Sequence, residues 1–235
     1  TIRMKSGIAL ISSVSLRSEA RSAAKQVRTP KRRSNGSARP DRPLGMSLLV
    51  YGLHALFWSP FMVRGHFDRI SGRQQTGPAA HASAAPSGLV ALHSLGLFAT
   101  YFGIGLGLFG NITLPFPMAA RLIGVPVLLA GTALVIRTLL VFRSWRLRAE
   151  LAEGHELCTE GPFRVVRHPI YTALVLLCIA SFFLVPNAST AAGVLTTFLT
   201  GDLRARAEEQ LLLGAFGERY AKLMATTKRF IPGVY

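Results

Sequence analysis

A short polar sequence stands directly before a long apolar segment, and its residue types could bind an anion. It reads Arg167-His168-Pro169, and Tyr171 follows two residues after the proline. Proline fits the first turn of a helix, where its missing N–H costs nothing. The free N–H groups at such a helix start favour a carboxylate or phosphate, and Arg167 would add a forked donor for the same anion. Since ionisable side chains at membrane depth usually have a function, we interpret this sequence as half of a binding site.

A second polar cluster follows the next apolar stretch and supplies the opposite charge. Arg204 and Glu208 are four residues apart, so they share one face of a helix. The adjacent pair Glu208-Glu209 could hold a cationic group, and Tyr220 lies further along the same polar stretch. An anion site on one element and carboxylates on another would together suit a zwitterionic or cationic ligand.

Long apolar segments must position both clusters. A membrane-spanning helix needs about 20 apolar residues, and the segments that approach this length cover 46–63, 88–110, 122–142, 170–185 and 189–200. Only Pro186-Asn187-Ala188 separates the last two, which predicts an antiparallel helical hairpin. The hairpin would return the second cluster to the side of the first. A polar helix over 202–226 follows, so the fold class we predict is an all-α membrane bundle of about five transmembrane helices with a C-terminal cytoplasmic helix.

Composition supports a membrane protein and argues against nucleic-acid binding. Charged residues make up 16% of the chain, compared with about 25% in soluble proteins, and the mean hydropathy is +0.36. The formal net charge is +16, but residues 1–45 alone hold eleven of the 27 Lys and Arg. We interpret this basic stretch as a disordered tail or a transit-like segment.

The distribution of Lys and Arg between loops predicts the orientation. The loops 64–87, 143–169 and 201–235 would lie on one face and together contain fourteen basic residues, whereas the loops on the other face contain one. Because basic loops stay in the cytoplasm, we expect a multi-pass protein with a cytoplasmic C-terminus. The expected membrane is the bacterial inner membrane, or the endoplasmic reticulum if the chain is eukaryotic.

The two polar blocks together resemble a known enzyme family. Residues 157–171 read LCTEGPFRVVRHPIY, and residues 208–232 contain EEQLLLGAFGERY and KRFIP. In this order, with a helical hairpin between them, they resemble the isoprenylcysteine carboxyl methyltransferase family and its relatives, the phospholipid N-methyltransferases. The resemblance covers about residues 120–235. It implies an integral membrane enzyme that uses S-adenosylmethionine, with membrane helices over 46–121 and a catalytic region over 122–235.

The resemblance also implies a site built from both blocks. Arg204 and Glu208 are the expected catalytic residues, and Arg204 would hold an anionic group of the methyl acceptor. His168 or Glu208 would position the cofactor. The expected partners are the lipid bilayer and a hydrophobic or lipid-linked acceptor with a carboxylate, amine or thiol; neither a nucleic acid nor a metal ion is expected. The cofactor-binding residues that the resemblance implies are Gly161, Pro162, Phe163, Arg167, His168, Pro169, Tyr171, Glu208, Glu209 and Tyr220.

Two other functional classes remain open. Membrane reductases of the sterol-reductase type also have an Arg-His-Pro-like helix start, but an Asn often stands before their tyrosine, where this chain has Ile170. A non-enzymatic membrane protein is the other alternative, in which Arg167 is a positive-inside anchor and Glu208-Glu209 is part of a solvated helix face.

The remaining histidines and small residues receive a structural interpretation. His54, His66, His81 and His93 lack metal-ligand spacing, and we expect them to be incidental. Glycines in the segment 88–110 would allow close packing of helices in lipid; they are Gly103, Gly105, Gly107 and Gly110.

Overall fold

The computed structural model describes residues 44–70, 87–142 and 157–235, with the side chain of residue 87 excepted. These residues all belong to one structural unit, Arg42–Tyr235. The predicted basic tail lies outside the described residues apart from its last two positions. Most of the basic stretch that precedes the first polar block, residues 143–156, also lies outside them.

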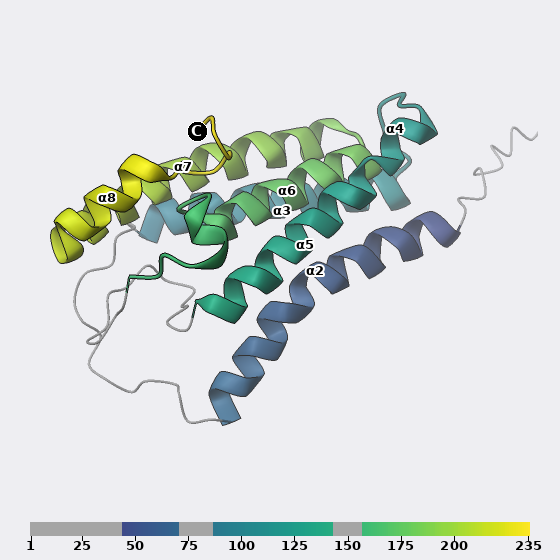
Figure 1. Cartoon of the computed structure of the whole chain (residues 1–235). Helices are drawn as coiled ribbons and strands as arrows, with labels where there is room; N and C mark the ends of the chain where they lie inside the picture. Colours follow the sequence, from purple (N-terminus) through teal and green to yellow (C-terminus); the bar gives the residue numbers. More distant parts are fainter. Residues whose placement is uncertain (1–43, 71–86, 143–156) are drawn as a thin grey trace, which may run out of the picture. The chain divides into compact units, whose positions relative to one another are not determined.

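The described part of the chain is helical, which confirms the predicted fold class. It contains no β-strand, and its one isolated β-bridge joins Val166 to Lys228. Figure 1 shows the elements in chain order. They are α2 (Leu44–Ile70), α3 (Ser87–Phe109), α4 (Met118–Leu122), α5 (Gly124–Val141), the short 3-10 helix η1 (Gly161–Arg164), α6 (Pro169–Leu184), α7 (Ala188–Phe216) and α8 (Glu218–Thr226).

Within the described residues, three stretches are long and apolar enough to cross a membrane: Leu44–Ile70, Gly88–Phe109 and Met118–Val141. The helix α6 is equally apolar but shorter, with 16 residues. Large apolar side chains such as Leu95, Phe98 and Phe102 are exposed on α3. Apolar side chains that face outward in this way suit contact with lipid, and the chain is an integral membrane protein by this composition.

Close packing of α3 along α7 forms one side of the bundle, while α5 packs along α6. A Cβ atom on Gly103 would lie 2.7 Å from the backbone nitrogen of Thr190, so the small residue is required for this approach. A Cβ atom on Gly107 would likewise lie too close to the side chain of Val185, whereas nothing lies within 4 Å of a Cβ on Gly105. The packing role predicted for these glycines therefore holds for Gly103 and Gly107 and was wrong for Gly105.

The turn between α6 and α7 is fixed to α3 by one side chain. The amide oxygen of Asn187 accepts hydrogen bonds from the backbone N–H groups of Ser189 and Thr190, both at 3.0 Å. Its nitrogen donates to the carbonyl of Gly103 at 2.8 Å. Asn187 therefore caps the start of α7 and holds the predicted hairpin against a third helix.

Two predicted helix boundaries were wrong. The first helix does not end at residue 63 but continues to Ile70. Arg64 stays within it because it pairs with Asp68 at 3.0 Å and donates to the carbonyl of Leu139. The boundary predicted between 189–200 and 202–226 is also wrong, because α7 continues through residue 201 and ends only at Phe216. The break comes at Gly217, whose φ of 52° favours glycine and directs the chain into α8.

We expect Gly193→Ala to lower the melting temperature in detergent clearly. A Cβ at this position would lie 2.1 Å from Oγ1 of Thr100 and 2.9 Å from its backbone nitrogen, so α3 and α7 would have to separate. Gly105→Ala is the matched control, since the space around Gly105 is open. Equal melting temperatures for the two variants would contradict this account of the α3–α7 contact.

Candidate functional site

The two polar blocks meet through their backbones. The N–H of Arg167 donates to the carbonyl of Lys228 at 2.8 Å, and the N–H of His168 donates to the carbonyl of Arg229 at 3.2 Å. Phe230 is buried, and its ring contacts the rings of His168 and Tyr171. The segment after α8 thus returns to the start of α6, which places α7 and α8 against the predicted Arg-His-Pro block.

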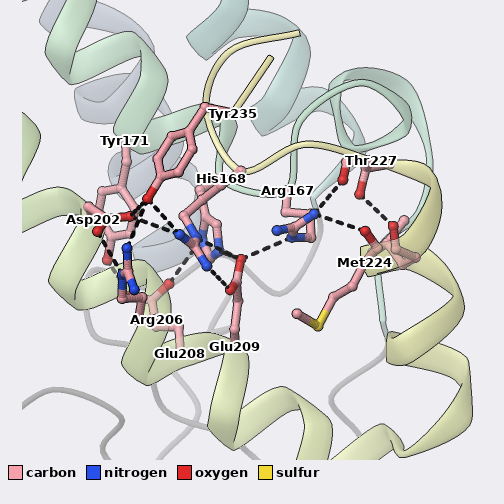
Figure 2. A network of polar contacts seen from close by, with 12 residues as sticks. Arg167, His168, Tyr171, Asp202, Arg206, Glu208, Glu209, Met224, Thr227 and Tyr235 are labelled. Carbon is pink, nitrogen blue, oxygen red and sulfur yellow. Dashed lines mark hydrogen bonds and ion pairs between the residues drawn. The ribbon is translucent and has the colours of Figure 1, made fainter. Parts of the chain in front are cut away.

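Glu209 is the centre of the polar network drawn in Figure 2, and its carboxylate is almost completely buried. Its Oε1 lies 2.9 Å from Nε of Arg167 and 3.3 Å from Nε2 of His168. Arg229 binds the same carboxylate in a forked manner, with Nη2 at 2.6 Å from Oε2 and Nε at 3.1 Å from Oε1. Three cationic or ionisable side chains therefore converge on one acid.

Glu208 has a different environment from its neighbour. The hydroxyl of Tyr171 donates to its Oε1, and Nδ1 of His168 lies 3.5 Å from its Oε2. Its side chain keeps 16% exposure, compared with 3% for Glu209. His168 thus lies between the two carboxylates, and only Glu208 has access to the surroundings of the site.

Charge pairing shifts the ionisation of this network. Burial acts to lower the pKa of His168, but its hydrogen bonds with Glu208 and Glu209 outweigh burial, so the pKa lies above its ordinary value. Burial acts to raise the pKa of Glu209, but hydrogen bonds from His168, Arg229 and Arg167 hold it far below the usual range. We therefore infer an ionised Glu209 and a protonated His168 that stabilise one another.

A second acid supports Arg229 from the other side. Oδ1 of Asp202 lies 3.0 Å from Nη1 of Arg229 and accepts from the hydroxyl of Tyr235 at 2.6 Å. Arg206 binds the other oxygen of Asp202 at 2.7 Å. Sequence reasoning missed Asp202, Arg229 and Tyr235 as members of the site. The signal for Arg229 was present, because it lies within the KRFIP stretch that the resemblance included.

Arg204 lies against Tyr171 rather than against Glu208. Its guanidinium carbon is 5.2 Å from the centre of the Tyr171 ring, and the residue is 7% exposed. Arg204 and Glu208 share one face of α7, as predicted, since both contact Tyr171, but no ion pair joins them in the described structure. Within the residues that the structure describes, Nε of Arg204 has no hydrogen-bond partner.

The approach to α6 packs on α5. Gly161 has a φ of 56°, and a Cβ there would come within 3.2 Å of Val141, so glycine suits this turn in two ways. Pro162 follows it in the 3-10 helix. Phe163 is buried, and its ring meets Phe142 with 5.2 Å between centroids. These residues therefore build the wall beside the network rather than the network itself.

The other two predicted residues occupy structural positions next to the network. Pro169 begins α6, as predicted from its missing N–H. Tyr220 is 2% exposed, and burial raises the pKa of its hydroxyl. That hydroxyl has no hydrogen-bond partner among the described residues, although Glu209 and Arg167 act on it electrostatically. A buried hydroxyl without a partner is costly, so it is a good candidate for binding a ligand.

The structure brings five of the predicted residues into direct contact in one network: Arg167, His168, Tyr171, Glu208 and Glu209. Arg204 joins this network through Tyr171. In the described parts of the chain, no group of three or more His, Cys, Asp and Glu side chains could hold a metal ion. The arrangement is a charged, largely buried cluster at the junction of α6, α7 and the segment after α8.

Comparisons with known proteins find similarity to one methyltransferase family and to the fold of one solved structure. Residues 122–214 match the model of the isoprenylcysteine carboxyl methyltransferase family. A solved structure, the eukaryotic intramembrane Ras methyltransferase isoprenylcysteine carboxyl methyltransferase without a monobody, is 20% identical to this chain, with a TM-score of 0.57. The match covers 83% of this chain and 70% of that one. A search of curated proteins finds no significant match.

Proposed function

We propose that the chain, whose residues 122–214 match the model of the isoprenylcysteine carboxyl methyltransferase family, is a member of this family and transfers a methyl group from S-adenosylmethionine to a hydrophobic or lipid-linked acceptor. The observation that carries this proposal is the joining of the two polar blocks around Glu208 and Glu209. Each block alone would be a helix start or a charged helix face, but together they form one buried site beside apolar helices.

The residues present fit a methyl donor of this kind. S-adenosylmethionine combines a sulfonium cation, an amino-acid group and a nucleoside. Glu208 is accessible and acidic, so we assign it to binding of the cationic part of the donor. The hydroxyl of Tyr220, which has no partner among the described residues, is assigned to a polar group of the donor. Glu209 already has Arg167, His168 and Arg229 as partners, so its proposed role is to hold these side chains in position.

Gly161, Pro162 and Phe163 complete the proposed donor site by shaping the turn before α6. The close approach of Gly161 to Val141 leaves no room for a side chain, and the burial of Phe163 against Phe142 fixes the position of this turn. Pro169 then sets the start of α6 directly after His168. These residues would form a rigid backbone wall for the donor rather than charged contacts to it.

The chemistry that the donor supplies is an activated methyl carbon, which leaves the protein to align the reactants and keep water away. Reacting atoms must approach to about 3–3.5 Å in the correct orientation, and exclusion of water strengthens every charge interaction in the site. Arg204 is buried on the side of α7 that faces Tyr171, and its Nε–H has no hydrogen-bond partner among the described residues. We assign it to an anionic group of the acceptor, which would enter from the lipid.

The proposed orientation keeps the site at the cytoplasmic face, because the loops on that side hold the basic residues. The proposed location is the bacterial inner membrane, or the endoplasmic reticulum in a eukaryote. An isoprenylcysteine carboxylate is one acceptor that the family name suggests, and phospholipid amines and thiols are others.

Ligand-induced stabilisation tests the donor directly. We expect the full chain in detergent to melt at a higher temperature with S-adenosylhomocysteine, because a ligand that binds only the folded state stabilises it. NADPH should produce no shift. Stabilisation by NADPH alone would instead favour a membrane reductase, and no shift with either compound, even at millimolar concentration, would count against the proposed methyltransferase.

A further inference from the structure

A third helix brings an imidazole to the acceptor side of the site. His93, on α3, is 4% exposed, and its ring meets the ring of Tyr171 with 5.7 Å between centroids. Arg204 lies over the same tyrosine ring. The sequence interpretation treated His93 as incidental, and the α3–α7 packing places it beside residues of both polar blocks.

The hydrogen bonds of Thr200 define which nitrogen of His93 carries a proton. The hydroxyl of Thr200 has a single hydrogen and lies 2.6 Å from the carbonyl of Thr196, to which it donates. It must then accept at its 3.0 Å contact with Nδ1 of His93, so Nδ1 carries the hydrogen. In the neutral imidazole with its hydrogen on Nδ1, the other nitrogen, Nε2, is an acceptor.

The free acceptor is Nε2. Among the described residues it has no hydrogen-bond partner, and neither does Nε of Arg204. A buried acceptor, Nε2 of His93, and a buried donor, the Nε–H of Arg204, thus belong to side chains that both contact the ring of Tyr171. His54 shows the contrast, because both of its ring nitrogens have partners, at Val50 and Ser181.

We propose that His93 Nε2 accepts the proton of the methyl acceptor, whose nucleophile is therefore an amine or a thiol, while Arg204 binds an anionic group of the same molecule. This inference rests on the proposed function and names its substrate class. A carboxylate nucleophile has no proton to give and would leave the lone pair of Nε2 unpaired. His93 would be a catalytic residue in this step, since it contacts the reacting group.

The step balances without any further reactant. The lone pair of the amine or thiol forms a bond to the methyl carbon, the carbon–sulfur bond of the sulfonium breaks, and its electron pair stays on sulfur as a neutral thioether. The proton of the nucleophile moves to Nε2 and gives an imidazolium, which later releases it to water. The ionisable groups that face the ring are Arg204 and Glu208 from α7 and Tyr171 from α6.

His93→Asn tests the proposal, because an asparagine amide can still donate to Thr200 but has no counterpart of Nε2. The acceptors are phosphatidylethanolamine, phosphatidylthioethanol and N-acetyl-S-farnesylcysteine in detergent micelles, with tritium-labelled methyl transfer as the readout. General-base catalysis contributes about 10²-fold or more, so we expect a loss of this size in kcat/KM with the lipid amine or thiol. Stabilisation by S-adenosylhomocysteine should be unchanged in the variant, and His54→Asn should retain turnover.

A pH profile separates proton transfer from a merely structural effect. With the thiol acceptor, the deficit of His93→Asn relative to the wild type should shrink as the pH rises, because a thiolate formed in alkaline solution needs no base, whereas a purely structural defect would persist at every pH. The proposal is overturned if the variant stays within threefold of the wild type, or keeps the same pH profile, or if the wild type binds S-adenosylhomocysteine but methylates only the carboxylate or none of the three. If the wild type does not bind S-adenosylhomocysteine at all, the proposed function itself fails, and this inference with it.

Discussion

The Glu209→Ala variant is expected to lose donor binding together with much of its stability. Removal of the carboxylate leaves Arg167, His168 and Arg229 side by side, largely buried, without their common partner. Breaking a buried ion pair from one side costs about 3–5 kcal/mol because a buried charge is left uncompensated. Thermal unfolding in detergent, with and without S-adenosylhomocysteine, measures both effects.

An exposed acid provides the control for Glu209. Glu218→Ala removes the same charge at the start of α8, where the side chain is exposed. This variant should melt close to the wild type and still respond to S-adenosylhomocysteine. If Glu209→Ala behaved like Glu218→Ala, the carboxylate would not be the centre that holds the two polar blocks together.

Arg204→Ala is expected to reduce turnover by about 10²-fold or more while the chain stays folded and binds the donor. In the described structure Arg204 joins the polar network through Tyr171 and not through Glu209, so its loss should remove the anchor for the acceptor but leave the donor site intact. Removal of a single pre-positioned charge or donor from a reaction site has effects of this size. Methyl transfer and S-adenosylhomocysteine binding, measured on the same preparation, test both halves of the expectation.

Variants at two neighbouring positions test whether the effect is specific to Arg204. Arg206→Ala should retain most of the activity, because that side chain is 59% exposed and binds the outer oxygen of Asp202. Glu208→Ala should weaken donor binding as well as turnover, since Glu208 is the accessible acid beside His168. A full rate in Arg204→Ala, or a loss of donor binding equal to that of Glu208→Ala, would contradict the assignment of Arg204 to the acceptor.

Local chemistry in the sequence was sufficient for part of the fold and of the site. The apolar segments predicted the membrane helices, and Pro169 predicted the start of α6. The three-residue link around Asn187 predicted the hairpin, which returns Glu208 and Glu209 to the level of His168. These predictions succeeded because each depends on residues that are close in the sequence or on a helix of known rise.

The predictions that failed depend on contacts between distant segments. A change from apolar to polar residues at Asp202 suggested a new helix, yet Gly201 packs beside His93 and Tyr171, and α7 continues through it. The position of His93 beside the site depends on a hydrogen bond to Thr200, which lies over a hundred positions further along the chain. Arg229 and Tyr235 reach the network only because the segment after α8 returns to α6. A single sequence contains no local signal for such pairings.

The unbroken α7 makes the thickness of the surrounding bilayer relevant to catalysis. Its 29 residues correspond to about 43 Å at ~1.5 Å per residue, but only its first part, residues 188–201, is apolar. These 14 residues correspond to about 21 Å, which is less than a hydrocarbon layer of roughly 30 Å. A short apolar stretch is accommodated by local thinning of the bilayer or by a shift of its flanking polar residues, and Glu208 and Glu209 lie on the same helix as this stretch. Lipid chain length would therefore change the depth of the two acids, and with it the geometry of methyl transfer, without touching any residue of the site.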